Sequence, residues 1–167
     1  GRWSRAERLI EAFGRDFPHA KQWPALIVEL REGRATEAES LRSELDEAMA
    51  ADDAGSVISC RDSLTRHVGG DELHELDRRV VAWVARWVKR RARGGAAEVA
   101  SVAALAGDRF ADTDEGRVLR DSVPGLRRRA GLCPACARPY RGNGETCADC
   151  LAEESRRPPT GRIKPRA

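Results

Sequence analysis

The feature that most constrains this chain is a stretch of twenty residues, 132–151, which reads LCPACARPYRGNGETCADCL. Four of the five cysteines lie in it, as two Cys-x2-Cys pairs with ten residues between them: Cys133, Cys136, Cys147 and Cys150. A tight turn within each pair points two sulfur atoms at one centre. Ten residues are enough for a short hairpin, and Gly142 and Gly144 supply the freedom for its reversal. The spacing predicts one four-sulfur site.

Four thiolates in a tetrahedral array suit Zn2+, and iron in a rubredoxin-like site is the competing metal. A catalytic zinc normally keeps one position for water, whereas four cysteines close the shell. The stretch has too few large apolar residues for a core of its own, and metal binding contributes about 10–16 kcal/mol of apparent folding free energy in small finger peptides. We therefore expect one structural zinc ion, with iron as the less favoured alternative.

The two pairs, LCPAC and TCADC, resemble the knuckles of a short zinc ribbon. The resemblance covers residues 132–151 and implies one structural zinc held by the four cysteines. Such knuckles often have glycine directly after the second cysteine, where the backbone turns its amides towards sulfur. This chain has Ala137 and Leu151 at those two places.

Outside this stretch, apolar residues recur at spacings of three and four, the period of amphipathic helices. We expect a first helix that ends at Pro18, and a second that begins around Pro24 and ends at Gly33. Thr36 and Glu39 form a capping-box pattern, which predicts that a third helix begins there. The stripe of the first helix consists of Trp3, Ala6, Ile10, Phe13 and Phe17.

Asp53 and Asp71 are expected to cap the next two helices. The helix after Asp71 is the longest of the expected helices, with acidic residues at its start and basic residues at its end, which complement the helix dipole. Its apolar middle includes Trp83 and Trp87, which we interpret first as core residues. The alternative is that these tryptophans are exposed and form a partner interface.

Residues 96–126 predict a helical hairpin whose second arm begins after Asp112 or Thr113 and ends at Pro124. Small residues in the first arm and the sequence Asp-Thr-Asp-Glu before the second resemble a tetratricopeptide-type helix pair, although no 34-residue period appears elsewhere. The resemblance implies stacking of helix pairs. No segment before residue 132 alternates with period two, so we predict a mainly α fold of about seven helices. They form an antiparallel helical bundle or short helical array, followed by the small C-terminal zinc ribbon.

Three regions follow from these patterns: an α-helical domain over residues 1–126, a four-cysteine zinc ribbon over residues 127–155, and a basic Pro-rich tail over residues 156–167. The tail, RRPPTGRIKPRA, cannot form a core alone and is expected to be extended or disordered unless a partner orders it. The chain begins with Gly1 rather than Met, so we expect a processed form or part of a longer protein.

Charge is unevenly distributed, because residues 127–167 hold ten basic and four acidic side chains. Arginines around the cysteines are candidates for contact with nucleic-acid phosphate or with a partner. The alternative is that these cations are an ordinary solvated surface. The candidates are Arg127, Arg128, Arg129, Arg138 and Arg141.

No nucleophile, base and orienting group assemble into a catalytic pattern. His74 is followed four positions later by Arg78 rather than by a second histidine, and Cys60 lies on an apolar helix face as a core thiol. We therefore expect that the protein is not an enzyme.

The patterns favour a non-enzymatic helical interaction or scaffold subunit that docks to a larger protein assembly. The alternative is a nucleic-acid-binding accessory protein that uses the Arg-rich ribbon and the basic tail. The apolar stretch 80–88 contains Arg86 and is far shorter than the ~20 residues needed to cross a bilayer. With no secretory signal at the start and with paired cysteines suited to a reducing compartment, we expect a cytoplasmic protein.

Overall fold

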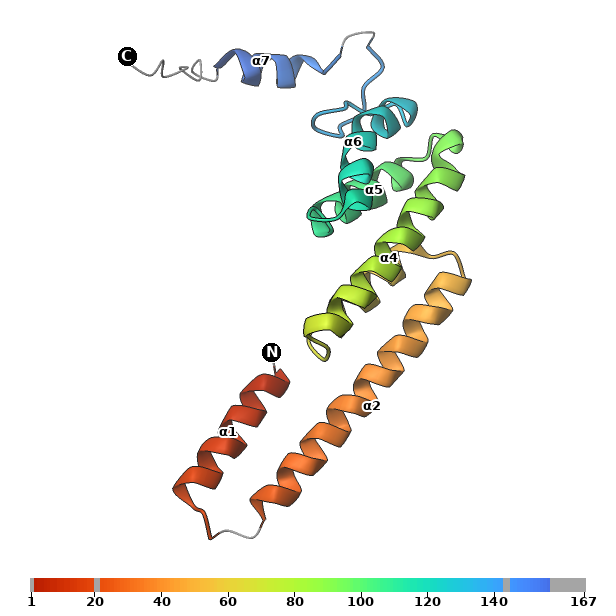
Figure 1. The fold of residues 1–167 in the computed structure, drawn as a ribbon. Coiled ribbons are helices and arrows are strands. Elements are labelled where there is room, and N and C mark those ends of the chain that lie inside the picture. Colours follow the sequence, from red (N-terminus) through yellow and green to blue (C-terminus); the bar gives the residue numbers. More distant parts are fainter. Residues whose placement is uncertain (1, 20–21, 143–144, 157–167) are drawn as a thin grey trace, which may run out of the picture. The chain divides into compact units, whose positions relative to one another are not determined.

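The computed structural model describes residues 2–19, 22–142 and 145–156. Within these ranges the protein has seven α-helices, one 3-10 turn and no strand, which confirms the predicted mainly α fold (Figure 1). None of these helices is both long enough and apolar enough to cross a membrane. The elements are α1 (Arg2–Asp16), α2 (Trp23–Ala50), α3 (Ala54–Leu64), α4 (Gly70–Arg91), η1 (Ala92–Gly94), α5 (Ala97–Arg109), α6 (Asp114–Arg129) and α7 (Ala148–Arg156).

The chain divides into two compact units, an N-terminal unit (Gly1–Trp87) and a C-terminal unit (Val88–Ala167). The division falls inside α4, so the last turn of that helix belongs to the C-terminal unit. The basic tail begins at Arg156, the last residue of α7, and its other residues, 157–167, lie outside the described residues.

In the N-terminal unit, α1 lies along α2, and α2 packs on α3 (Figure 1). The core is made by side chains that are almost completely buried: Leu45, Val57, Leu64, Val80, Val81, Val84 and Trp87. The indole Nε1 of Trp87 donates to the carbonyl oxygen of Asp52 at 2.9 Å. Trp87 is therefore a core residue and not an exposed partner interface, while Trp83 is half-buried.

A buried ion pair links α3 to α4 in the same unit. The Arg61 side chain is 8% exposed, and its Nε donates to Asp77 Oδ1 at 2.7 Å. A second carboxylate, that of Asp62, accepts from Arg61 Nη1 at 3.1 Å. Because the buried guanidinium is paired, removal of Asp77 would leave a poorly compensated buried charge.

The expected break in α2 at Gly33 is wrong, because a single helix runs from Trp23 to Ala50. Gly33 instead gives room to a neighbouring ring: a Cβ added there would lie 3.3 Å from Cη2 of Trp3. Thr36 does not cap a helix, since its hydroxyl donates to the carbonyl of Glu32 at 2.9 Å, one turn back. Glycine in a helix costs about 1 kcal/mol relative to alanine, a cost that packing of the indole of Trp3 offsets.

The C-terminal unit contains the predicted helical hairpin, with α5 packed against α6. Thr113 caps α6 as expected, by accepting from the amide of Gly116 at 3.0 Å. The expected end at Pro124 is wrong, because α6 continues to Arg129. Proline inside a helix costs about 3 kcal/mol, and here the buried residues on both sides of it, Leu119 and Leu126, keep the helix in register against α5.

The expected cap at Asp71 is wrong, because α4 begins at Gly70 and Asp71 lies inside its first turn. Asp53 caps α3 by accepting from the amide of Ser56 at 3.1 Å, as expected. Helix α7 was not predicted, since the expected zinc ribbon placed a hairpin in that region. The number of helices agrees with the prediction because α2 merges two expected helices while α7 adds one.

Candidate metal centre

The first cysteine pair lies in the turn that follows α6. Gly131, with φ of 69°, reverses the chain in the left-handed conformation that ends many helices. The amide of Leu132 then donates to the carbonyl of Arg127 at 2.8 Å. This turn and this hydrogen bond bring the segment with Cys133 and Cys136 back to the end of α6.

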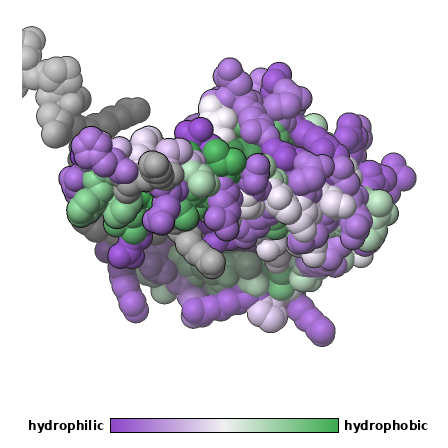
Figure 2. Space-filling view, turned by 90° about the horizontal axis from the view of Figure 1, so that it is seen from below, coloured by the Kyte–Doolittle hydropathy of each residue, from purple (hydrophilic) through white to green (hydrophobic). Residues whose placement is uncertain are grey.

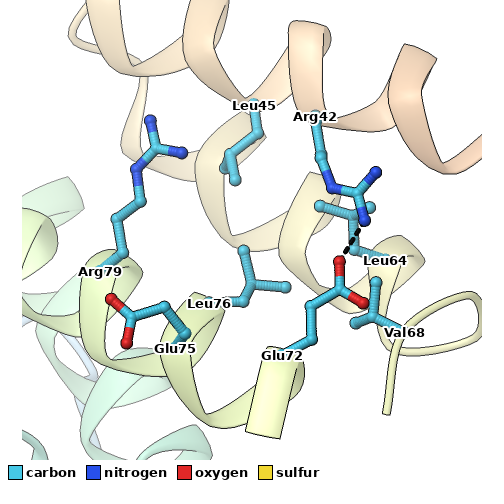
Figure 3. A pocket seen from close by; sticks show the side chains of 8 residues that line it. All are labelled: Arg42, Leu45, Leu64, Val68, Glu72, Glu75, Leu76 and Arg79. Atoms are coloured by element: carbon cyan, nitrogen blue, oxygen red, sulfur yellow. Dashed lines mark hydrogen bonds and ion pairs between the residues drawn. The ribbon is translucent and has the colours of Figure 1, made fainter.

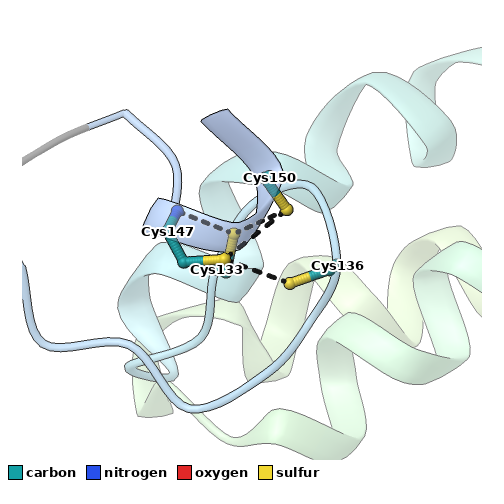
Figure 4. A group of neighbouring side chains, drawn as sticks. All are labelled: Cys133, Cys136, Cys147 and Cys150. Carbon is teal, nitrogen blue, oxygen red and sulfur yellow. Dashed lines mark hydrogen bonds between the residues drawn. The ribbon is translucent and has the colours of Figure 1, made fainter. Parts of the chain in front are cut away.

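The second pair belongs to the start of α7. Cys147 stands just before the helix and Cys150 lies in its first turn, with Asp149 between them as an acidic residue near the positive end of the helix dipole. Residues three apart lie on the same side of a helix, so both sulfur atoms face the first pair (Figure 4). The start of a helix, rather than the expected hairpin, therefore positions the second pair of cysteines.

All four sulfur atoms lie within 4.8 Å of one another. The Sγ–Sγ distances are 3.9 Å for Cys133 and Cys150 and 3.5 Å for Cys147 and Cys150. Cys136 and Cys147 are 3.6 Å apart. A disulfide needs about 2.05 Å, whereas thiolates around one tetrahedral zinc at about 2.3 Å lie about 3.8 Å apart. The predicted clustering is confirmed, and the four cysteines fit one tetrahedral metal ion.

The backbone of the first pair has the conformation that a zinc knuckle requires. Ala137, directly after Cys136, has φ of 60°. Its amide donates to the carbonyl of Cys133 at 2.9 Å, and the amide of Cys133 donates to the carbonyl of Arg138 at 2.8 Å. The left-handed conformation costs a non-glycine residue about 1–2 kcal/mol, so the knuckle forms here against a local preference.

The ribbon itself is not seen in the described residues. They contain one isolated antiparallel bridge, between Leu132 and Pro139, and no strand ladder. Residues 143–144, in the middle of the expected hairpin, lie outside the described residues. The sequence CADCLAEESR carries the missed signal, since Ala, Leu and Glu favour a helix after Asp149.

Hydrogen bonds shift the pKa values of two of the four thiols in opposite directions. Backbone amides, that of Cys136 first, lower the pKa of Cys133 to about 6. Hydrogen bonds with the other thiols, that of Cys136 first and then that of Cys147, raise the pKa of Cys150 to about 12. Negative charge therefore forms most readily on the buried Cys133, and an incoming cation has to displace the proton of Cys150.

Two of the arginines expected to contact nucleic acid or a partner instead contact other residues of the C-terminal unit. Arg127 Nη1 donates to the carbonyls of Pro134 and Ala135 at 2.8 and 2.9 Å, which holds the first knuckle on α6. Arg138 pairs with Asp149 of α7 at 2.8 Å. The other three assigned arginines are exposed: Arg128, Arg129 and Arg141.

One side of the centre faces an open cleft of about 440 Å³. Cys136 and Cys150 line it, beside the carboxylates of Glu153 and Glu154. Cys133 does not line this cleft and is completely buried. The centre therefore has one accessible face and one protected face.

A cleft in the N-terminal unit has an apolar floor of Leu45, Leu64, Val68 and Leu76 (Figure 3). At its rim Arg42 pairs with Glu72, whereas Glu75 and Arg79 pair with Arg78 and Asp46, which do not line the cleft. Cys60 is half-buried, and burial raises its pKa, which disfavours a reactive thiolate.

Comparison with protein families, with curated proteins and with solved structures found no match for this chain.

Proposed function

We propose that this chain is a non-enzymatic interaction or scaffold protein, braced by one structural zinc ion and docked to a larger protein assembly. The observation that carries the proposal is the closed set of four sulfur atoms, all within 4.8 Å of one another. Four protein ligands leave no position for a substrate or a reactive water, so the ion has a structural role.

The role of the zinc follows from how α7 is attached. Helix α7 has no buried residue, and at nine residues it is too short to be stable alone in water. Among the described residues, the sulfur cluster and the surface pair of Arg138 with Asp149 link it to the rest of the unit. The ion therefore joins α7, and the tail that continues from Arg156, to the end of α6.

A row of exposed apolar side chains on α1 supports protein docking. Leu9 and Phe13 lie four residues apart and are 62% and 41% exposed, and Phe17, just after the helix, is 57% exposed. The rings of Phe13 and Phe17 lie 5.0 Å apart. The surface in Figure 2 is mainly hydrophilic with apolar areas among the polar ones. Adjacent exposed aromatic rings are typical of interaction surfaces.

Metal analysis tests the first half of the proposal. Reduced protein prepared without chelators should contain one zinc per chain by elemental analysis and should be colourless. Cys150→Ser should lose the ion, whereas Cys60→Ser should keep it. A preparation with no bound metal, or a coloured one that contains iron, would overturn the zinc assignment.

Cross-linking in the native source followed by mass spectrometry tests the second half. The unmodified chain should cross-link to one main partner protein. The double variant Phe13→Gln/Phe17→Gln should no longer cross-link to that partner. Val118→Gln removes a side chain that is 67% exposed on α6 and should retain it. Equal recovery with all three proteins would contradict docking through α1.

A further inference from the structure

We infer that the C-terminal unit also carries a cation cluster, Lys89, Arg93, Arg128 and Arg129, that binds the phosphodiester backbone of a nucleic-acid duplex. This surface goes beyond the proposed scaffold function, which requires no nucleic acid. Two of its members, Lys89 and Arg93, are not among the arginines that the sequence pattern indicates as candidates for contact with nucleic acid or a partner.

The fold brings the two halves of the cluster together at Gly95. This residue has φ of 64°, and a Cβ added to it would lie 2.9 Å from the carbonyl oxygen of Arg129. The turn after α4 is therefore in direct contact with the end of α6. Arg93 stands two residues before that contact, although it is more than thirty residues from Arg129 in the sequence.

All four side chains are exposed, and each belongs to a basic helix end. The last turn of α4 carries Lys89, Arg90 and Arg91, and η1 adds Arg93. The last turn of α6 carries Arg127, Arg128 and Arg129. The whole unit, residues 88–167, holds 17 basic and 10 acidic side chains.

The helix dipole explains only part of this accumulation. One or two cations at a helix C-terminus contribute about 0.3–1 kcal/mol each by interacting with the last carbonyls. Two such ends in contact bring like charges together, which opposes folding of the unit. An anionic partner would relieve that repulsion, and binding would release its counterions as an additional driving force.

The side chains favour the backbone of a duplex over a single strand. The planar guanidinium of arginine binds phosphate oxygens in a bidentate manner. Single-strand binding relies on aromatic rings on which bases stack. The sequence of this unit has two aromatic residues, of which Phe110 is buried and Tyr140 half-buried. Contacts to phosphate alone carry no base specificity, so binding should be independent of sequence.

The test is fluorescence anisotropy of a labelled duplex DNA with the zinc-loaded full chain at salt concentrations from 50 to about 300 mM, a range over which phosphate contacts weaken steeply. Arg93→Gln/Arg128→Gln/Arg129→Gln should weaken binding at least tenfold at about 150 mM salt. It should also reduce the slope of log K against log salt by about 2.7, since each phosphate contact contributes about 0.9.

The matched control carries Arg15→Gln/Arg31→Gln/Arg78→Gln, three exposed arginines of the N-terminal unit. It changes the net charge by the same amount as the first variant. It should bind the duplex almost as the unmodified chain does. Circular dichroism and zinc content should be unchanged in both variants. Equal weakening in the two variants, absence of duplex binding, or binding to phosphatidylserine vesicles in place of the duplex would overturn the inference.

Discussion

The two units of this chain are stabilised in different ways. The N-terminal unit buries apolar side chains of α2, α3 and α4 in a continuous core and carries 13 basic and 17 acidic residues. The C-terminal unit is basic, and its last helix contributes no buried side chain. Burial of apolar surface supports the first unit, whereas the end of the second depends on four sulfur atoms. The contrast predicts that a change made in one unit can unfold part of that unit while the other unit stays folded.

Removal of the metal should have the largest effect. A chelator strong enough to take the ion should abolish amide protection over residues 147–156, because structural zinc contributes about 10–16 kcal/mol in small finger peptides. Hydrogen exchange measured by mass spectrometry reads this segment directly. All four tryptophans lie before residue 88, so their fluorescence should stay constant. Loss of native tryptophan fluorescence on chelation would show that the two units are not separate in stability.

Leu45→Ala should act on the opposite unit. Leu45 is 1% exposed in the core of the N-terminal unit, and truncation of a buried leucine costs about 2–5 kcal/mol. Urea unfolding followed by tryptophan fluorescence gives the change in free energy of unfolding. Competition with a chromophoric chelator should give the same zinc affinity as in the unmodified chain. A parallel fall in zinc affinity would contradict the separation of the units.

Ala137→Gly should strengthen the metal centre slightly. Glycine adopts the left-handed conformation without the steric penalty of a Cβ, so we expect a gain of about 0.5–1 kcal/mol in zinc binding. The control is Leu151→Gly, the corresponding position after the second pair. Leu151 lies inside α7, where glycine should weaken binding instead. If both variants change affinity in the same direction, the strain at Ala137 does not limit the centre.

The Asp53 cap at the start of α3 should make the smallest of these contributions, seen in how the stability of the N-terminal unit depends on pH. Hydrogen bonds from Ser56, its side chain first, lower the pKa of Asp53 in the folded protein. The stabilisation is therefore present above the ordinary carboxyl pKa and is lost as the pH falls through the lowered value. Asp53→Asn keeps a capping oxygen without the charge, so its stability should depend less on pH below about 5. Identical pH profiles of the two proteins would exclude this contribution.

The parts of the structure that local sequence determines were predicted well. Cys-x2-Cys spacing places two sulfur atoms together whether the backbone is a turn or a helix, so the clustering of all four cysteines was predicted. The caps at Asp53 and Thr113 involve residues three positions apart and were also predicted. In these cases the physical cause and its effect lie within one turn of the chain.

The errors have causes that lie far away in the sequence. Gly33 stays helical with the indole of Trp3, thirty residues earlier, packed against it. Helix α6 continues through the exposed Pro124 because its buried residues pack in the α5–α6 hairpin. Contact between the turn at Gly95 and the end of α6 likewise depends on tertiary packing. No periodicity or spacing within one segment contains that information.

The one-sided exposure of the metal centre has a kinetic consequence. Cys133 is sealed from solvent, while Cys136 and Cys150 line an open cleft beside two carboxylates. Within the described residues, ligands that compete for the proposed ion should approach from this cleft, where Cys136 is the most exposed of the four cysteines. Glu153 and Glu154 repel anionic chelators on that path, so the speed at which the ion exchanges depends on the charge of the competitor as well as on its affinity.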